Sequence, residues 1–480
     1  MKEKFSRQKI FSNLIWRFLE RTGAQAVSFI VTIVLARILA PEDYGTIALI
    51  SVFTNIFNVF VDSGLGMALV QKKDADKIDF STVFYTNIVF CISLYVLIWF
   101  LSPFIAHFYR KNDFTAIIRV LSVTVPISGF KNVQQAYVSK TLQFKKFFFS
   151  TLTGTLLAAA VGIWMAYKGF GVWSLVAQQL VNVGVDTVVL WLTVKWHPCF
   201  IFSFERLKQL FAYGWKLLLS ALIETAYRNL RQLIIGKKYT PSELAFYNKG
   251  DSFPSIIVIN INNSIESVLF PAMSTEQDNK TRLKTITRRS VKTGTFFIAP
   301  LLIGLAVCAP SIVRLLLTEK WIDAVPFLRI FCITYIFYPI HTANLSAINA
   351  LGRSDVFLKL EILKKIVGML VLLSTMCLGV IAIAYSVLLL DFFSQIINSY
   401  PNKKLLNYSY FEQLKDILPG ILLAVMMGII ICLFNFLDIH DLVRLIIQIP
   451  LGTVIFLLSA KIFHLETYEY MTNFFYERFV

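Results

Sequence analysis

Charged and amide side chains recur at helical spacing inside two apolar stretches of the sequence. The two sets are Arg17, Arg21, Gln25 and Ser28, and Glu224, Arg228, Arg231 and Gln232. Residues three or four apart share one face of a helix, so each set predicts a polar stripe. If these helices cross a membrane, the ionisable groups are costly unless they face a water-filled cavity or a partner. Because a guanidinium offers a planar fork for phosphate oxygens, the stripes favour a path for an anionic group.

The charged stripes also allow a simpler interpretation. Arg17 and Arg21 lie near one end of their stretch, where their side chains can extend to lipid headgroups, and Arg231 can do the same near the opposite end of its own stretch. Glu224 can pair with Arg228, one helical turn away. Both interpretations remain open, and they differ in whether lysine can replace arginine.

Uncharged polar residues extend the pattern to three more stretches. Their stripes are Asn55, Asn58 and Asp62; Gln178, Asn182 and Asp186; and Asp391, Gln395 and Asn398. Amides and carboxylates hydrogen-bond sugar hydroxyls, but they also join neighbouring membrane helices. Weaker candidates are Lys131, Gln134, His341, Asn344, Lys364 and Lys365. Candidates for coupling to a sodium ion or a proton are Glu224, Glu361 and Asp391.

The stretches that carry these residues are long enough to cross a bilayer, which takes about 20 mostly apolar residues. The chain has 56% hydrophobic and 16% charged residues and a mean hydropathy of +0.66. We therefore predict an all-α, polytopic membrane protein with about 14 transmembrane helices. The predicted spans are residues 13–36, 46–70, 80–106, 114–137, 147–167, 170–194, 211–235, 243–270, 291–317, 326–350, 356–379, 381–399, 414–436 and 440–463.

Most lysine and arginine residues, which outnumber the acidic residues to give a formal net charge of +17, lie between the spans rather than on one soluble face. This distribution argues against a nucleic-acid partner. It instead predicts topology, because cytoplasmic loops carry an excess of basic residues. Lys284 and Lys403 belong to the more basic set of loops and Lys237 to the less basic set, so both termini are expected in the cytoplasm.

The sequence offers no motif for catalysis or metal binding. Its six cysteines stand singly, without a Cys-x-x-Cys motif or a histidine at ligand spacing, and are expected to be free thiols. No His-Glu-x-x-His, P-loop or Gly-x-Ser-x-Gly motif occurs. We therefore expect no metal, no cofactor and no enzymatic activity.

Two turns in different halves of the chain are alike. Residues 39–45 and 239–245 each place a proline and, two residues later, an acidic side chain between long predicted helices. Both residue types are ordinary turn formers, but duplicated halves are typical of transporters that move around a central site. We expect two pseudo-symmetric six-helix lobes around a central cleft, residues 1–200 and 201–400. Two further helices and a cytoplasmic tail follow in residues 401–480.

Five segments carry a likeness to a known family. They read ARILAPEDYG (36–45), DSGLGMALVQKK (62–73), STVF (81–84), LQFKK (142–146) and ALGRSD (350–355). Together they resemble the polysaccharide transporters of the multidrug/oligosaccharidyl-lipid/polysaccharide superfamily, and within it the Wzx-type oligosaccharide flippases. The resemblance implies a V-shaped pair of helical lobes in a bacterial cytoplasmic membrane. It also implies transfer of an undecaprenyl-diphosphate-linked glycan to the outer leaflet by alternating access.

The resemblance implies substrate-binding or coupling roles for residues of the polar stripes. The expected substrate-binding residues are Arg17, Arg21, Gln25, Asn58, Asp62, Asn182, Arg228 and Arg231, and the expected coupling residues are Glu224, Glu361 and Asp391. The expected partners are a lipid-linked oligosaccharide, membrane lipids, a coupling ion (sodium or a proton), a polysaccharide polymerase and a chain-length regulator.

Two other functions are weaker alternatives. A drug/cation antiporter of the same superfamily would need a lining richer in acid than in arginine. A membrane glycan polymerase or ligase would need a large external loop or domain, which the short predicted loops do not provide.

Overall fold

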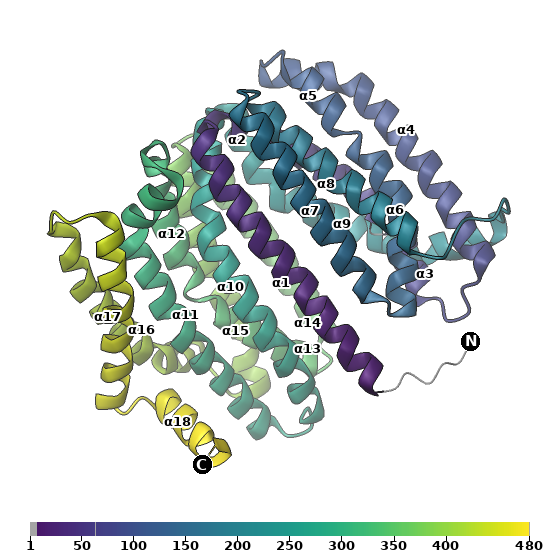
Figure 1. Ribbon diagram of the computed structural model, residues 1–480. Helices are drawn as coiled ribbons and strands as arrows, with labels where there is room; N and C mark the ends of the chain where they lie inside the picture. Colours follow the sequence, from purple (N-terminus) through teal and green to yellow (C-terminus); the bar gives the residue numbers. More distant parts are fainter. Residues whose placement is uncertain (1–6, 63, 480) are drawn as a thin grey trace. The chain divides into compact units, whose positions relative to one another are not determined.

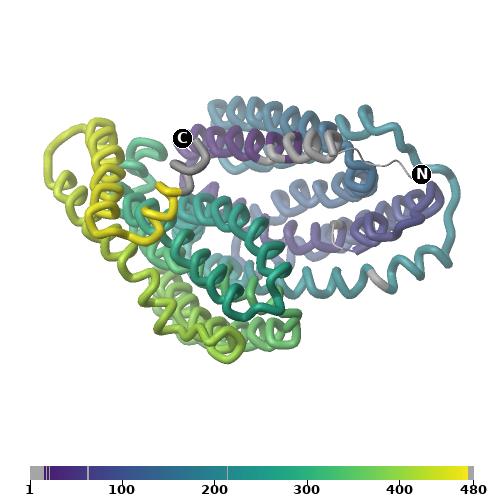
Figure 2. Tube along the Cα trace, turned by 90° about the horizontal axis from the view of Figure 1, so that it is seen from below, coloured from purple at the N-terminus to yellow at the C-terminus, as the bar shows by residue number. Residues whose placement is uncertain are grey.

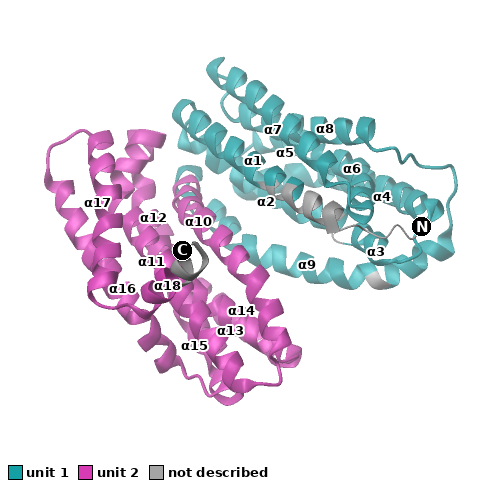
Figure 3. Ribbon diagram, turned by 60° about the horizontal axis from the view of Figure 1, so that its bottom comes forward, with its two compact units in different colours: residues 1–244 teal, residues 245–480 magenta. Residues whose placement is uncertain are grey.

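The computed structural model describes residues 7–62 and 64–479, and within its helices the side chains of residues 7–15, 18, 21, 62, 213 and 474–479 lie outside the described part. The described residues form helices joined by short connections, with no strand among them (Figures 1 and 2). The prediction of an all-α fold is therefore confirmed. The chain divides into two compact units, residues 1–244 and 245–480 (Figure 3).

The first unit is built around long helices that pack side by side. Its helices are α1 (Arg7–Ile38), α2 (Pro41–Asp62), α3 (Leu65–Gln71), α4 (Lys77–Tyr109), α5 (Phe114–Leu121), α6 (Thr124–Thr141), α7 (Phe144–Tyr167), α8 (Val172–Thr193) and α9 (Phe204–Lys238). Helix α1 runs along α7, which in turn packs against α8 (Figures 1 and 2). Helix α9 packs on α2, α3 and α4.

The second unit is centred on α11 and α15. Its elements are α10 (Pro241–Thr275), whose first residues belong to the first unit, α11 (Lys280–Leu317), η1 (Glu319–Ala324), α12 (Val325–Tyr335), α13 (Tyr338–Ala350), α14 (Ser354–Thr375), α15 (Val380–Leu406), α16 (Tyr410–Cys432), η2 (Leu433–Phe436), α17 (Asp441–Ile462) and α18 (Glu466–Phe479). Helix α11 packs on α12, α13, α16 and α17, and α15 packs on α12, α13 and α14. The lobe boundaries at residues 200 and 400 stay predictions.

Eleven helical stretches of the described chain are long and apolar enough to cross a membrane. Three other long helices, α1, α9 and α14, fall outside this set, although α1 contains the shorter apolar segment Thr22–Ile38. These three helices carry most of the charged residues singled out in the sequence. The eleven stretches together with α1, α9 and α14 are consistent with the fourteen predicted spans. The number of helices that cross the membrane stays a prediction.

Helices α2 and α10 begin in the same way. A proline occupies the first helical position of each, where its missing N–H group is not needed. The backbone N–H of Ala40 donates to the carboxylate of Asp43 at 3.2 Å, and that of Thr240 donates to Glu243 at 3.0 Å. The acidic side chains also suit the positive end of the helix dipole. The likeness of the two turns in sequence is thus a likeness in structure.

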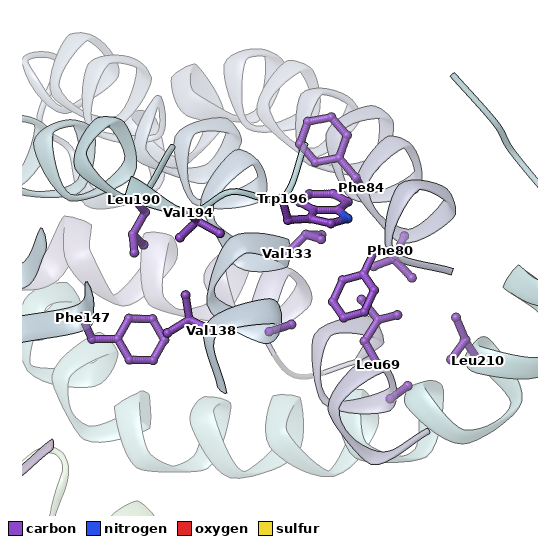
Figure 4. Packing of buried hydrophobic residues seen from close by; sticks show 13 residues of the cluster. Leu69, Phe80, Phe84, Val133, Val138, Phe147, Leu190, Val194, Trp196 and Leu210 are labelled. Atoms are coloured by element: carbon purple, nitrogen blue, oxygen red, sulfur yellow. The ribbon is translucent and has the colours of Figure 1, made fainter. Parts of the chain in front are cut away.

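Aromatic side chains fix the segment that leads into α9. The rings of Phe80 and Phe84 on α4 lie 5.7 and 6.1 Å from the ring of Trp196, which follows α8 (Figure 4). The backbone carbonyl of Trp196 accepts a hydrogen bond from Gln134 of α6 at 3.0 Å. Helices α4 and α6 therefore hold the chain in place shortly before α9 begins.

Candidate functional site

The middle of α9 presents charged side chains away from the protein interior. Arg228 is 78% exposed and Glu224 is 48% exposed, and their side chains approach to 3.7 Å. Arg231 is half-buried, and its Nε atom has no hydrogen-bond partner among the described residues. Arg228 precedes the end of α9 by ten residues, or about 15 Å along the axis. The charge therefore lies within the helix and not at its end.

Contacts at both ends of α9 hold it against other helices of the first unit. Near its end, a Cβ atom added to Gly236 would lie 2.5 Å from the side chain of Leu49, so α2 and α9 approach closely there. Near its beginning, Arg206 forms ion pairs with Asp76 at 2.5 Å and with Asp79 at 3.4 Å. Although partial burial raises the pKa of Asp76, hydrogen bonds from the Asp79 N–H and from Arg206 together hold that pKa below its usual value. The charged middle of α9 is thus carried by a helix that is anchored at both ends.

Arg17 is half-buried near the start of α1. Its Nη1 atom lies 2.6 Å from the Glu20 carboxylate, and its guanidinium lies 5.6 and 5.3 Å from the ring centres of Phe144 and Phe147 on α7. Cation–π contacts of this kind contribute about 0.5–1 kcal/mol at exposed sites. Arg17 therefore ties α1 to α7, and its part in substrate binding stays a prediction.

The other predicted substrate residues of the first unit are spread over α1, α2 and α8. Gln25 is exposed, and Asn58 and Asn182 are half-buried. The Oδ1 atom of Asn58 has no hydrogen-bond partner within the described part of the chain. Arg21 and Asp62 lie in α1 and α2, but their side chains fall outside the described residues. Because α2 packs on both α8 and α9, the helices that carry Asn58, Asn182 and the α9 stripe belong to one group.

An ion pair joins α6 and α8 inside the first unit. The Lys131 Nζ atom lies 3.0 Å from Asp186 Oδ2, and both side chains are mostly buried. Asp186 therefore joins two neighbouring helices, as the alternative interpretation of the stripe Gln178, Asn182 and Asp186 predicted. The signal in the sequence was a lysine inside one span and the single acidic residue of another, since charges inside a membrane usually pair.

A second, partly buried pair joins α13 and α15 in the second unit. His341 Nε2 lies 2.8 Å from Asp391 Oδ1, and His341 Nδ1 lies 2.9 Å from Asn398 Nδ2. One turn further along, Asn344 donates to Gln413 of α16 at 2.8 Å, so a polar network links three helices. Asp391, a predicted coupling residue, thus has a histidine partner that spacing along the chain does not identify.

The three predicted coupling residues lie on three different helices. Glu224 is on α9 and Asp391 is on α15, while Glu361 lies on α14 and pairs with Lys364 at 2.5 Å. The charge of Glu361 is therefore compensated within its own helix, at i and i+3. Its role in coupling stays a prediction.

An apolar cavity of about 440 Å³ lies between α11, α16 and α17. Its walls include Phe297, Leu301 and Met427. Gln448 also lines the cavity, but it donates to the backbone carbonyl of Ile431 at 2.8 Å and is fully buried. Because its amide is satisfied within the protein, the cavity suits a hydrocarbon chain.

A second cavity, of about 450 Å³, lies between α11, α16 and α18 and is lined by ion pairs. Lys292 of α11 contacts Asp416 of α16 at 3.3 Å and Glu466 of α18 at 2.5 Å. The hydrogen bond from Lys292 lowers the pKa of Glu466 below its usual value. These contacts tie α18 to the helix bundle. No cluster of three or more potential metal ligands occurs among the residues that the structure describes.

The fold defines the class of protein. The chain is similar, with a TM-score of 0.76, to the solved structure of the lipid II flippase MurJ in an inward closed conformation, over 94% of this chain and 99% of that one. At 13% sequence identity this likeness concerns the fold. The chain shares the fold of this flippase, and its described part has eleven helical stretches long and apolar enough to cross a membrane, so it is a multi-pass membrane protein.

Residues 34–326, more than half of the chain, match the family described as "Polysaccharide biosynthesis protein", and the chain belongs to that family. It is 28% identical over 304 residues to the teichuronic acid biosynthesis protein TuaB of Bacillus subtilis, and this alignment spans 62% of each chain. It is 22% identical over 415 residues to the lipopolysaccharide biosynthesis protein WzxC of Escherichia coli, over 86% of this chain and 82% of that one. The solved structures that share this fold are named as transporters, not as enzymes: the lipid II flippase MurJ and, with a TM-score of 0.62 and 17% identity over 80% of this chain and 94% of that one, a multidrug resistance transporter.

Proposed function

We propose that this chain is a flippase that moves an undecaprenyl-diphosphate-linked oligosaccharide from the inner to the outer leaflet of a bacterial cytoplasmic membrane. Its product would enter lipopolysaccharide, capsule or exopolysaccharide biosynthesis. The observation that carries the proposal is the exposed charge in the middle of α9, where Arg228 is 78% exposed.

If α9 crosses the membrane, as predicted for residues 211–235, its exposed arginine is stable only where it meets water or an anion, because transfer of the charge into lipid is costly. A path beside Arg228 and Arg231 would suit a diphosphate, whose oxygens accept bidentate hydrogen bonds from guanidinium groups. The same path would repel an organic cation. The balance of charge on α9 thus favours an anionic substrate over the cations that a drug antiporter carries.

The substrate also has a long hydrocarbon chain, which needs apolar surroundings. The apolar cavity between α11, α16 and α17 offers about 440 Å³ beside such side chains as Phe297 and Leu301. Burial of hydrocarbon there is worth about 25 cal/mol per Å² of apolar surface. We assign this cavity to part of the polyprenyl chain, and Asn58 and Asn182 to contacts with the sugars.

The relatives support the class of substrate. TuaB and WzxC are named for the biosynthesis of teichuronic acid and lipopolysaccharide, and MurJ is named as a flippase of lipid II. In this account the chain alternates between inward-open and outward-open states. A polymerase and a chain-length regulator would use its product at the outer face.

Deletion of the gene in its own host tests this proposal. We expect the surface polysaccharide to disappear and its lipid-linked precursor to accumulate in the cytoplasmic membrane, and we expect a plasmid copy to reverse both effects. A strain that lacks the first glycosyltransferase of the pathway is the control, since it should lose the polysaccharide without accumulating the precursor. Normal export in the deletion strain would contradict the proposed function.

A further inference from the structure

Two cavities of the second unit meet at one side chain. The polar cavity between α11, α16 and α18 and the apolar cavity between α11, α16 and α17 have volumes of about 450 and about 440 Å³, and Phe296 lines both. On α11, residues from Lys284 to Phe296 line the polar cavity, and residues from Phe296 to Ile312 line the apolar one. The apolar part extends over about 24 Å of the helix axis. A polar compartment that adjoins a long apolar one has the chemistry of a lipid site, with room for a headgroup and for hydrocarbon.

The polar cavity contains a buried hydroxyl group that no protein group satisfies. Thr295 is 1% exposed, and its Oγ1 atom has no hydrogen-bond partner among the described residues. Thr295 lines the polar cavity and directly precedes Phe296, so the hydroxyl lies where the two cavities meet. Because a buried hydroxyl without a partner is costly, each such group calls for an explanation. A polar ligand in this cavity would supply the missing hydrogen bond.

Basic side chains outnumber acidic ones around the polar cavity. Its charged lining comprises the basic residues Lys284, Arg288, Lys292 and Lys415 and the acidic residues Glu412, Asp416 and Glu466. The side chain of Asp416 is 6% exposed and lies 2.7 Å from Arg288 and 3.3 Å from Lys292, so it is a fixed part of the wall. Lys415 is exposed and forms no ion pair within the described part of the chain. The lining therefore favours an anion, to which ammonium and guanidinium groups donate strong hydrogen bonds.

Glu466 is the acidic group of this lining that a ligand can displace. Its carboxylate lies 2.5 Å from Lys292, but its side chain is 70% exposed, whereas that of Lys292 is 14% exposed. An ion pair with so exposed a partner contributes little to stability. Glu466 belongs to α18, a helix of 14 residues that also contacts α11 through Tyr470, whose ring centre lies 4.7 Å from the Arg289 guanidinium. The carboxylate of Glu466 thus occupies a place on Lys292 that also suits a phosphate oxygen.

We propose that the two cavities form a loading site for the lipid-linked oligosaccharide, with its diphosphate in the polar cavity and part of its polyprenyl chain in the apolar one. This inference rests on the proposed function, and it adds to the arginines of α9 a second binding site for the same diphosphate. The diphosphate displaces the Glu466 carboxylate from Lys292, and the Thr295 hydroxyl donates to a phosphate oxygen. Return of Glu466 to Lys292 then favours release of the lipid.

The charge and the position of the polar cavity favour this lipid over a phospholipid. Once Glu466 is displaced, four basic side chains face two acidic ones, which leaves an excess of two positive charges. A diphosphate that joins a lipid to a sugar carries one negative charge on each phosphate, whereas the headgroup of phosphatidylglycerol carries a single charge. Lys284 belongs to the loops expected in the cytoplasm, so the cavity is expected at the face from which the proposed transport starts.

Binding of undecaprenyl diphosphate to the full chain tests the loading site. All proteins carry Arg228→Gln, which weakens the site proposed on α9, and the bound lipid is measured by native mass spectrometry. We expect Lys292→Gln to weaken binding roughly tenfold or more, and Glu466→Gln to strengthen it roughly threefold, because a neutral amide does not compete for Lys292. Glu319→Gln, which breaks an exposed ion pair with Arg314 outside the cavity, is the matched control and should leave binding unchanged.

The opposite signs of these two effects separate a binding site from a purely structural ion pair. A contact that only fastens α18 is lost in both Lys292→Gln and Glu466→Gln, so both variants would then change lipid binding in the same direction. Glu466 is exposed, and its replacement should leave the fold intact. Unchanged or weaker binding with Glu466→Gln, or undiminished binding with Lys292→Gln, would overturn the proposal.

Competition with phosphatidylglycerol identifies the lipid. We expect phosphatidylglycerol at equal concentration to leave most of the undecaprenyl diphosphate bound. Its displacement by phosphatidylglycerol, with the same response to Lys292→Gln and Glu466→Gln, would assign the cavity to phospholipid and overturn the loading site. If the wild type restores surface polysaccharide to the deletion strain but Lys292→Gln binds undecaprenyl diphosphate undiminished, this inference alone fails. Failure of the wild type to restore the polysaccharide would instead count against the proposed function.

Discussion

The backbone of Gly45 lies directly against Pro241, so that a Cβ atom added to Gly45 would sit 1.7 Å from the Pro241 carbonyl oxygen. The two residues belong to the similar turns that open α2 and α10, both described within the first unit. Only a glycine permits this approach, because the neighbouring atom is backbone and cannot rotate away. The two turns are therefore in contact in this conformation.

Replacement of Gly45 by alanine should destabilise this conformation. Forcing extra volume into a close contact typically costs about 1–3 kcal/mol. Thermal unfolding of the purified protein should show a lower midpoint for Gly45→Ala. Gly184→Ala is the matched control, since no atom lies within 4 Å of its added Cβ, and it should be neutral or slightly stabilising. Equal midpoints for Gly45→Ala and the wild type would contradict the contact.

If the protein alternates between two states, the two turns should also separate. Spin labels at Glu42 and Ser242 report the distance between them, and we expect two populated distances whose ratio changes when lipid-linked oligosaccharide is added. A background in which the six native cysteines are replaced is needed, and its activity is the control. A single distance, unchanged by substrate, would count heavily against alternating access.

Hydropathy predicted the membrane helices well because the bilayer, and not the tertiary structure, sets the apolar length that a span needs. It could not resolve local breaks. The span predicted at residues 114–137 is two helices, since α5 ends at Leu121 and α6 begins at Thr124, close to Pro126. Pro126 has no N–H to donate to the carbonyl of Ser122, four residues earlier, and its ring crowds that carbonyl, but a hydropathy window averages over such a short interruption.

The polar residues show a second limit of prediction from the sequence. Helical spacing grouped Asp186 and Asp391 with other polar residues of their helices, but it could not name their partners, Lys131 and His341. Lys131 and His341 are distant in the sequence, and the identity of a neighbouring helix is decided by packing. The close contact of Gly45 with Pro241 could not be predicted from the sequence either, because packing also decides it, although the similarity of the two turns could be recognised.

The topology is open to a direct test. The positive-inside rule predicts that Lys284 and Lys403 face the cytoplasm and that Lys237 faces outward. Cysteine at each position, treated with an impermeant thiol reagent on intact cells, should react at position 237 only, and permeabilised cells should allow reaction at all three. Reaction at position 284 but not at position 237 in intact cells would show that the orientation is inverted.

The arginines can be tested by graded substitution. If Arg21 and Arg228 hold the diphosphate, replacing either with alanine removes a charge-assisted contact worth about 1.5–3 kcal/mol, and export of the surface polysaccharide should fall roughly tenfold or more. Glutamine should fail as well, and lysine should restore export only in part, because it loses the bidentate fork. An arginine that only extends to lipid headgroups would be replaced fully by lysine. Membrane abundance of each variant is the control, and full export with the glutamine variants at normal abundance would exclude these arginines from substrate binding.

The central claim is that this chain moves a lipid-linked oligosaccharide between leaflets. The share of the oligosaccharide that is accessible in the outer leaflet of a liposome measures that movement directly. Lipid-linked oligosaccharide from the host is incorporated with or without the purified protein, and an impermeant oxidant then attacks the sugars on the outer surface. Without protein, about half of the oligosaccharide should stay protected, whereas with the wild type nearly all should become accessible and with Arg228→Gln it should do so at least tenfold more slowly. Equal protection with and without the wild-type protein would contradict the account.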